Sequence, residues 1–269
     1  RVLFRSQIGY APIVKTARDF GLGDVSGIDV PGEKKGIIPD PDWKKKRTKT
    51  VWYRGDTILL SIGQGFTLVT PIQLAKAYTF LANKGWAYEP HVVSRIEDVQ
   101  TGKIETVVTQ KTVLTDYPAS FYETINDALI ATVDQNNGTT KIMKNPYVKV
   151  AAKSGSAQNP HSKLTHAWAA GYFPADTEPE IVFVCLLEGA GGGGVMAGGM
   201  AKRFLDKYLE VEKGIEVVKK TPQTETKQVN TSTTQRNVNN NNSEQGRGEE
   251  TVNEERETET TSTSEGEEN

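Results

Sequence analysis

The sequence predicts an α+β domain in residues 1–210, followed by a linker and a disordered tail in residues 211–269. Three segments with helical apolar spacing come first, and three short β-branched, apolar runs then follow one another before a last helical segment. Helices followed by successive strands are typical of a sheet faced by helices. The connections between the apolar runs are short, which favours antiparallel neighbours in that sheet.

The predicted helices have recognisable ends. Gly21 is placed as the C-terminal cap of the first helix, and Thr70 followed by Pro71 is a typical start for the second. Apolar residues recur at helical spacing, so each helix should bury one face. The helices are expected at residues 8–20, 71–84, 117–133 and 195–209.

The predicted strands follow the third helix. Alternating or continuous apolar runs bounded by turn residues indicate strands. They are expected at residues 149–154, 167–173 and 181–188, and a separate hairpin should pair residues 92–98 with 103–109.

Residues 21–50 are dense in Gly, Pro, Asp and Lys, which predicts a long surface loop. A loop of this length inside a domain is uncommon and usually functional. Within it, the cluster Lys44-Lys45-Lys46-Arg47 is expected to be a solvated face, with an anion site as the alternative.

The end of the chain has the composition of a disordered segment. Residues 221–269 contain no aromatic residue, and their only large apolar residues are three valines. Such a segment cannot bury enough apolar surface to offset its ordering entropy. Its 11 Glu and 4 Lys and Arg give it a net charge of −7, so the chain's net −2 leaves +5 for residues 1–220. No run interleaves basic and aromatic residues, so no nucleic-acid partner is expected.

The single cysteine, Cys185, lies in an apolar run. An inert thiol in a buried strand is therefore expected rather than a nucleophile. The sequence also has no run of eighteen apolar residues of the kind that spans a membrane.

Two further motifs are expected to be structural. The run Gly189–Gly194 matches the spacing of a dinucleotide-binding loop, but no strand is expected after the helix that follows it. A strand-to-helix turn beside the Lys153 strand is therefore favoured. His161 and His166 have a spacing that occurs in zinc sites, but no cysteine or acidic pair accompanies them, so they are expected to be polar loop residues. No cofactor and no metal are expected.

The functional prediction depends on Lys153-Ser154-Gly155-Ser156. An apolar run precedes these residues, so they should lie on a strand, and Gly155 marks a close approach of another backbone. A Lys-Ser/Thr-Gly triplet on a strand is the third signature of the active-site serine transpeptidases and β-lactamases. The other two signatures, Ser-x-x-Lys and Ser-x-Asn, do not occur in this sequence.

Five stretches of the chain share one resemblance. They are Phe20-Gly21-Leu22-Gly23 with Ser26-Gly27-Ile28-Asp29, Trp43-Lys44 with Trp52-Tyr53-Arg54-Gly55-Asp56-Thr57, Ile62-Gly63-Gln64-Gly65 with Thr70-Pro71-Ile72-Gln73-Leu74-Ala75, Ala152 to Gln158, and Glu188 with the glycine run. In this order they resemble the transpeptidase domain of class B penicillin-binding proteins, and most of all its cell-elongation subclass, penicillin-binding protein 2.

The resemblance covers about residues 1–209 and implies a penicillin-binding/β-lactamase-like transpeptidase fold that is incomplete in this chain. In the family, Ser-x-x-Lys and Ser-x-Asn precede the first of the five stretches. The chain opens on Arg1 rather than Met. It is therefore expected to be a piece of a longer protein that also carries the nucleophile, a membrane anchor and an amino-terminal pedestal domain.

The resemblance also implies an activity, that of a peptidoglycan D,D-transpeptidase in cell-wall elongation. A serine attacks a D-Ala-D-Ala peptide bond, and an amine of a neighbouring stem peptide resolves the acyl-enzyme. Lys153 would raise the positive potential of the cleft, while the hydroxyls of Ser154 and Ser156 would bind the substrate carboxylate. The Ser156 N–H would be one oxyanion donor, and Gly155 would leave room for the acyl group. Gln64 is expected to be structural, in a tight backbone site that supports the helix from Pro71.

The implied partners are peptidoglycan stem peptides, β-lactams and a cell-elongation glycosyltransferase, with the catalytic domain on the periplasmic side of the cell membrane. This chain alone should be inactive, because it lacks the nucleophile. One alternative is a non-catalytic, degenerate transpeptidase fold that acts as a cell-wall scaffold. Another is a serine carboxypeptidase or β-lactamase, which fits the Lys153 triplet but fits Gly63-Gln64-Gly65 poorly.

Overall fold

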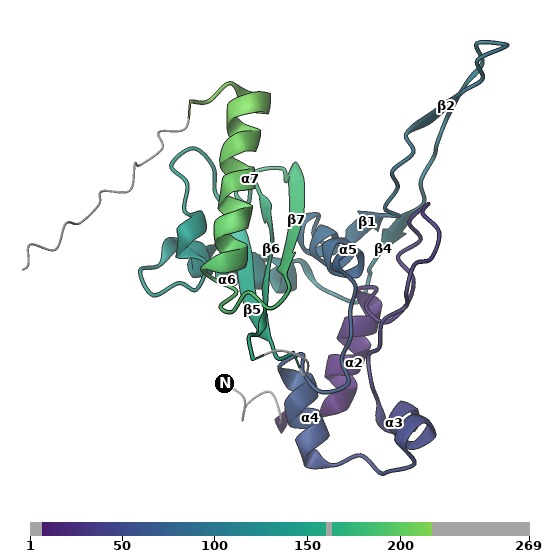
Figure 1. Ribbon diagram of the computed structural model, residues 1–269, viewed down its shortest axis with the longest axis vertical. Helices are drawn as coiled ribbons and strands as arrows, with labels where there is room; N and C mark the ends of the chain where they lie inside the picture. The colour runs from purple at the N-terminus through teal and green to yellow at the C-terminus, as the bar shows by residue number, and fades with distance from the viewer. Residues whose placement is uncertain (1–6, 160–162, 217–269) are drawn as a thin grey trace, which may run out of the picture. The chain divides into compact units, whose positions relative to one another are not determined.

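A computed structural model describes residues 7–159 and 163–216 (Figure 1), and the predicted tail lies outside the described residues. The predicted strands form one antiparallel sheet in the order β5-β6-β7. Their bounds are β5 (Ala151–Ala157), β6 (His166–Phe173) and β7 (Ile181–Leu187). The helices are α2 (Tyr10–Asp19), α3 (Pro41–Thr48), α4 (Arg54–Ser61), α5 (Pro71–Ala82), α6 (Ala119–Asp134) and α7 (Met196–Lys213), with a 3-10 turn at η1 (Lys141–Met143).

Helices cover both faces of this sheet. On one face, Ala152 and Phe183 pack with Leu205 of α7. On the other face, Ala151 packs with Leu129 of α6 and with residues of α5. Successive strand residues point to opposite faces, so each strand contributes to both cores. The predicted α+β class, an antiparallel sheet faced by helices, is therefore confirmed.

The four predicted helices are present, and their capping signals are used. The Thr70 hydroxyl accepts a hydrogen bond from Gln73 N at 3.3 Å, and the Gln73 side chain accepts one from Thr70 N at 3.1 Å. This reciprocal pair satisfies two backbone donors at the start of α5. Gly21, predicted as the cap of α2, has a φ of +83°, which favours glycine. The last helix ends at Lys213 rather than at residue 209.

The prediction that residues 21–50 form a loop without secondary structure was wrong, because α3 lies within them. The Asp40 carboxylate accepts a hydrogen bond from Trp43 N at 2.7 Å, and Pro41 occupies the first helical position. This start signal is local and was missed because the segment lacks apolar periodicity. Helix α4, which begins after Tyr53, was not predicted either.

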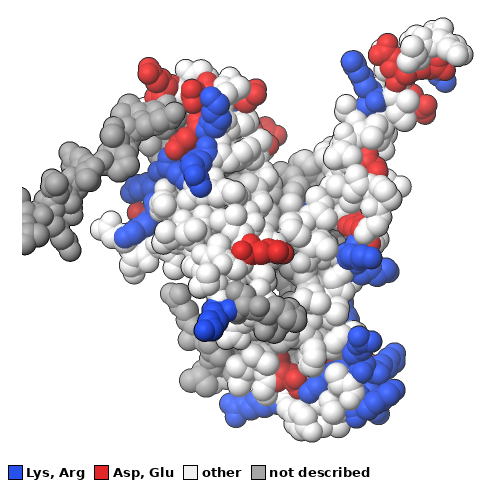
Figure 2. Space-filling model, in the orientation of Figure 1, with Lys and Arg blue, Asp and Glu red and all other residues white. Residues whose placement is uncertain are grey.

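The expectation of a solvated lysine cluster in α3 was wrong for one residue. Lys45, Lys46 and Arg47 are exposed, and basic side chains gather over α3 in Figure 2. Lys44 is buried instead, and its Nζ lies 2.6 Å from the Asp56 carboxylate of α4. Asp56 also accepts a hydrogen bond from Tyr53 N at 2.7 Å. The pair therefore ties α3 to the start of α4.

Replacing Lys44 by methionine should lower the free energy of unfolding by about 3 kcal/mol, because it leaves a buried carboxylate without its counter-charge. Burial alone raises the pKa of the Asp56 carboxyl, but the Lys44 ammonium and the Tyr53 N–H hold that pKa below its usual value. The pair therefore stabilises the fold above about pH 4 and loses its contribution as the pH falls through the lowered pKa. Urea unfolding at pH 7 and below pH 4 measures both effects. Lys45→Met, at an exposed neighbour, should change stability little, and an equal loss in that variant would contradict the role of the pair.

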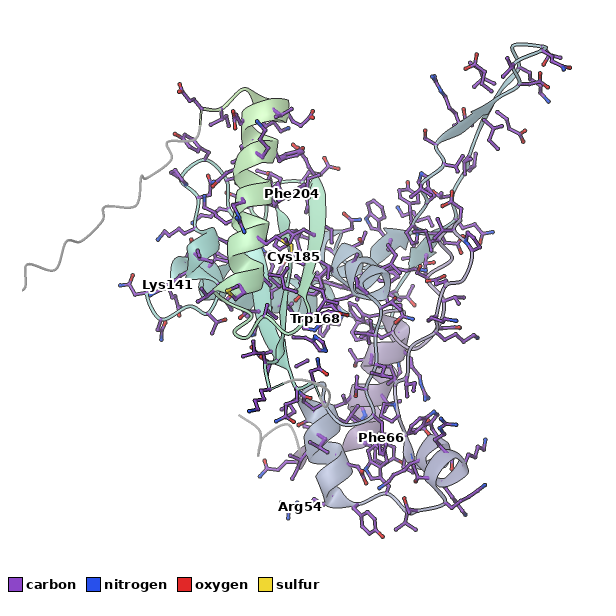
Figure 3. All side chains as sticks on the ribbon, in the orientation of Figure 1. Arg54, Phe66, Lys141, Trp168, Cys185 and Phe204 are labelled. Atoms are coloured by element: carbon purple, nitrogen blue, oxygen red, sulfur yellow. The ribbon has the colours of Figure 1, made fainter. Side chains whose placement is uncertain are left out.

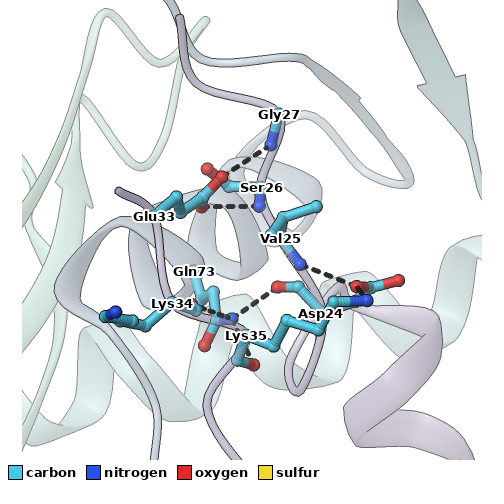
Figure 4. Close-up of polar contacts among 8 residues, drawn as sticks. All are labelled: Asp24, Val25, Ser26, Gly27, Glu33, Lys34, Lys35 and Gln73. Atoms are coloured by element: carbon cyan, nitrogen blue, oxygen red, sulfur yellow. Dashed lines mark hydrogen bonds and ion pairs between the residues drawn. The ribbon is translucent and has the colours of Figure 1, made fainter. Parts of the chain in front are cut away.

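The loop between α2 and α3 is held to α5 by one buried amide. The Gln73 side chain has no exposed surface, and its Nε2 donates to the carbonyls of Asp24 and, at 2.7 Å, of Lys35 (Figure 4). Nearby, the Glu33 carboxylate accepts from Ser26 N at 2.6 Å and from Gly27 N at 3.2 Å. These hydrogen bonds to the Gln73 amide and the Glu33 carboxylate fix the long loop in place despite its composition.

The predicted hairpin is present as β2 (Arg95–Glu97) and β3 (Ile104–Thr106), with shorter strands than expected. It continues from a second antiparallel pair, β1 (Trp86–Tyr88) and β4 (Lys111–Val113), which was not predicted. Three-residue strands are too short to show a periodicity of two. Among the helices of the described residues, none is long and apolar enough to cross a bilayer.

Candidate active site

All four predicted site residues lie on β5, the edge strand of the sheet. Within the described residues β5 pairs only with β6, and Lys153 lies opposite Ala170 while Gly155 lies opposite Trp168. Trp168, which Figure 3 labels, belongs to β6, and β6 lies between β5 and β7 in the sheet. One edge of β5 is therefore free of strand partners in the part of the chain that the structure describes.

The predicted polar side chains divide between the two faces of β5. Ser154 and Ser156 share a face with Ala152, which packs against α7. Lys153 and Gly155 belong to the opposite face. The Ser156 hydroxyl accepts a hydrogen bond from Gly193 N at 3.1 Å. The two hydroxyls thus lie on the side of the glycine run, and Lys153 extends from the other side of the same edge.

Three carbonyls along the outer edge of β5 accept hydrogen bonds from side chains. Ala152 O accepts from the Thr132 hydroxyl at 2.5 Å, and Ser154 O accepts from Lys153 Nζ at 2.5 Å. Ser156 O accepts from Gln64 Nε2 at 3.4 Å. In an extended strand the N–H and C=O of one residue point to the same side. The N–H groups of Ser154 and Ser156 therefore also point to the free edge.

The glycine run is the turn between β7 and α7, as predicted, and it lies beside β5 and β6. Gly191 N donates to Thr165 O at 2.9 Å, and the Thr165 hydroxyl donates to Gly191 O at 2.7 Å. Gly189 N donates to Nδ1 of His166 at 3.2 Å. No strand follows α7 in the described residues, so the dinucleotide unit that the spacing suggested is not formed there.

The packing around the site requires glycine at one position of the site and not at another. A Cβ on Gly193 would lie 2.0 Å from Gly155 O and 2.8 Å from Trp168 O, so the packing of two backbones requires glycine there. A Cβ on Gly155 would meet only the Trp168 side chain, at an ordinary contact distance of 3.6 Å. The protein's own packing therefore does not require glycine at position 155.

The histidine and cysteine predictions have mixed outcomes. His166 is the first residue of β6 and not a loop residue as predicted, because it pairs with Ala157 of β5. Its ring accepts the Gly189 N–H and so joins β6 to the glycine run. His161 lies outside the described residues. Cys185 is half-buried in β7, and burial raises the pKa of its thiol, in agreement with the predicted inert thiol. The described residues contain no group of three or more His, Cys, Asp or Glu side chains that could hold a metal ion.

Sequence reasoning missed two residues that contact β5. Gln64 was expected to support the helix from Pro71, but its side chain reaches the Ser156 carbonyl instead. Its flanking glycines both have a φ of +71°, which permits the tight turn. Thr132 of α6 holds the Ala152 carbonyl and also contacts the Thr140 hydroxyl at 2.6 Å. The glycines around Gln64 signalled the turn, but nothing local signalled the direction of either side chain.

Comparisons with known proteins cover most of the chain. The model of the penicillin binding protein transpeptidase domain matches residues 2–210. The peptidoglycan D,D-transpeptidase MrdA of Haemophilus influenzae is 35% identical over 207 residues, which are 71% of this chain and 32% of that protein. MrdA of Escherichia coli K12 is 32% identical over 205 residues, 71% of this chain and 32% of that protein. The chain thus spans about a third of the length of these curated relatives.

Solved structures give the same result for the fold. The structure of Pseudomonas aeruginosa PBP2 in complex with WCK 5153 matches with a TM-score of 0.67 and 30% identity, covering 81% of this chain and 48% of that chain. The complex between PBP2 and MreC from Helicobacter pylori also matches with a TM-score of 0.67, at 26% identity, covering 79% of this chain and 38% of that chain. Each of these two matches covers about four fifths of this chain.

Proposed function

The chain belongs to the penicillin-binding protein transpeptidase family, and we propose that it supplies one wall of a peptidoglycan D,D-transpeptidase site of the cell-elongation type. That wall is the free edge of β5, with Lys153, Ser154, Gly155 and Ser156 as its site residues. The proposal extends to the domain organisation, with residues 1–210 as the transpeptidase part and residues 211–269 as a linker and tail.

The observation that carries the proposal is the outer edge of β5. It presents the Ser156 N–H, which is a donor of the kind that stabilises the oxyanion of an acyl transfer. A substrate peptide or a β-lactam can lie along an open strand edge and accept such backbone hydrogen bonds. Gly155 supports this role, because its missing Cβ leaves space at the edge that the protein itself does not use.

The residues of the wall have distinct roles in this reaction. The Lys153 ammonium supplies positive charge beside the cleft, which favours the terminal carboxylate of a D-Ala-D-Ala stem peptide. The hydroxyls of Ser154 and Ser156 bind that carboxylate, and the Ser156 hydroxyl is oriented by Gly193 N. The attacking serine is in residues that this sequence does not contain, since Ser-x-x-Lys is absent from it. That serine forms an ester with the acyl group, D-alanine leaves, and the amine of a second stem peptide then breaks the ester.

The cellular setting is part of the same proposal. One solved relative is a complex of PBP2 with MreC, and a peptidoglycan synthase complex is also similar, with a TM-score of 0.61 and 28% identity. We infer that the whole protein works with other cell-wall synthesis proteins, including a glycosyltransferase, and binds β-lactams. The catalytic domain would lie outside the cytoplasm.

A chimera tests the proposal. Residues 2–210 of this chain replace the matching part of the H. influenzae MrdA, which retains its own preceding residues. The chimera should be labelled covalently by a fluorescent penicillin, whereas this chain alone should give no labelled band. A chimera that is folded by circular dichroism but never labelled would support a non-catalytic scaffold instead.

Replacing Gly155 by alanine in the chimera should slow penicillin acylation about tenfold, because a Cβ would enter the space left for the acyl group. The same change in this chain should leave the free energy of unfolding unchanged or raise it by up to about 1 kcal/mol, since the added Cβ meets no backbone and restricts the unfolded chain. Labelling kinetics and urea unfolding separate the two effects. A loss of stability with no loss of acylation would assign Gly155 to folding rather than to the site.

A further inference from the structure

The hairpin of β2 and β3 is exposed on both strands. All six of its strand residues are exposed, including Ile96 at 58% and Ile104 at 54%. Its base is fixed, because the Asp29 carboxylate accepts hydrogen bonds from Val92 N at 2.8 Å and Val93 N at 2.9 Å. Figure 1 draws the hairpin as a two-stranded ribbon that continues beyond β1 and β4. A two-stranded ribbon is only marginally stable by itself and has two open edges.

The hydrogen bonds within the hairpin identify the residues at the open edge of β2. Val107 N donates to Ser94 O at 3.1 Å, and Asp98 N donates to Lys103 O at 2.9 Å. Backbone groups of a strand alternate in direction, so Ile96 shares the inner side with Ser94 and Asp98. Arg95 and Glu97 therefore direct their N–H and C=O groups to the outer edge. Asp29 binds the N–H of Val93 on the same edge but does not reach these two residues.

The charged side chains at this edge are complementary to those of a second copy of the same strand. If a second β2 lies antiparallel with Ile96 opposite Ile96, Arg95 of each copy lies opposite Glu97 of the other. The pairs of Arg95 and Glu97 are then the hydrogen-bonded pairs, because both residues direct their backbone groups outward. Neither side chain has an ion pair with another described residue. Both charges are thus available to a partner.

The same charges select one register. Sliding one strand by two residues brings Arg95 opposite Arg95, or Glu97 opposite Glu97, and like charges directly opposite each other are destabilising. Sliding by one residue turns the backbone groups out of register. Charged residues at a sheet edge usually prevent association. Here they oppose the neighbouring registers and favour the one in which Ile96 lies opposite Ile96.

We propose that the outer edge of β2 is a docking surface for a second copy of this chain, which pairs antiparallel about Ile96 and joins the two hairpins into a four-stranded sheet. The interface is isologous, as expected for a two-fold dimer, because each copy contributes the same three residues. This surface lies on the hairpin and uses none of the residues assigned above to the β5 wall. The proposed dimer therefore does not depend on whether the β5 wall is catalytic.

Disulfide trapping in the full chain tests the pairing. In a Cys185→Ser background, Ile96→Cys places two thiols opposite each other at a non-hydrogen-bonded pair, where Cα atoms are about 4.5 Å apart and a disulfide fits. Val99→Cys is the matched control, because Val99 is 96% exposed but lies in the turn between β2 and β3, outside the strand residues that pair in this register. Under mild oxidation, Ile96→Cys should form a disulfide dimer about tenfold faster than Val99→Cys, as a specific pairing of modest affinity requires. Equal rates would overturn the proposal.

Charge reversal provides a second test, in which a further substitution should restore the original rate. Adding Arg95→Glu to the Ile96→Cys protein should slow dimer formation about tenfold, because both cross-strand pairs become like-charged. Adding Glu97→Arg as well should restore the original rate, since the opposite-charge pairing returns. Failure of the double reversal to restore the rate, or cross-linking only to a different protein in a mixture, would contradict a symmetric pairing of this chain.

Discussion

Replacing Lys153 by alanine in the chimera with H. influenzae MrdA should reduce the second-order rate of penicillin acylation about a hundredfold or more. The ammonium lies at the edge of β5, where its Nζ donates to Ser154 O at 2.5 Å, beside the position proposed for the carboxylate of the ligand. Loss of the charge removes both the attraction for that carboxylate and the positive potential around the nucleophile. Time courses of fluorescent penicillin labelling measure the rate.

The control for this prediction is Lys103→Ala. Lys103 is an exposed lysine in the connection between β2 and β3, so its loss changes the net charge equally without changing the residues that contact the β5 edge. Acylation of this variant should stay within about threefold of the parent chimera, because interactions between exposed charges are screened by salt. Urea unfolding of both variants should be unchanged, since surface substitutions rarely exceed about 0.5 kcal/mol. Equal losses of acylation in the two lysine variants would show that net charge, and not the position of Lys153, is responsible.

Replacing Gly193 by alanine should lower the free energy of unfolding of this chain by about 3 kcal/mol. The new Cβ would be placed 2.0 Å from Gly155 O and 2.8 Å from Trp168 O, and neither backbone atom can turn aside as a side chain can. The glycine run must then separate from β5, which also breaks the hydrogen bond from Gly193 N to the Ser156 hydroxyl. The melting temperature should fall by about 6–12 °C for a domain of this size.

Gly192 is the matched control for that substitution. A Cβ on Gly192 would meet no atom within 4 Å. Gly192→Ala should therefore leave the melting temperature within about 2 °C of the parent chain. If Gly193→Ala were as mild as Gly192→Ala, the close packing of the glycine run on β5 would be wrong.

Features that depend on neighbours in the sequence could be predicted from it. The start of α5 was predicted because Thr70 and Pro71 are adjacent and together form a typical N-cap followed by a first helical position. The sheet was predicted because its three strands are consecutive and joined by connections that suit antiparallel pairing. The placement of Lys153 on a strand followed from the apolar run before it.

Features that depend on contacts between distant residues could not be predicted in this way. Lys44 is buried only because α4 brings Asp56 to it, and nothing near Lys44 in the sequence indicates that partner. Gln64, in the turn after α4, and Thr132, on α6, contact β5 from separate parts of the chain, and their hydrogen bonds depend on how those parts pack on the sheet.

The central claim, that the β5 edge is one wall of an acyl-serine site, is tested most directly by locating the acylated residue in the chimera. The chimera is incubated with a penicillin, digested, and the modified peptide is identified by mass spectrometry. We predict a single acyl-serine in the Ser-x-x-Lys signature contributed by the relative, formed at a rate that depends on Lys153. Acylation of Ser154 or Ser156, or an acylation rate unaffected by Lys153→Ala, would contradict the account.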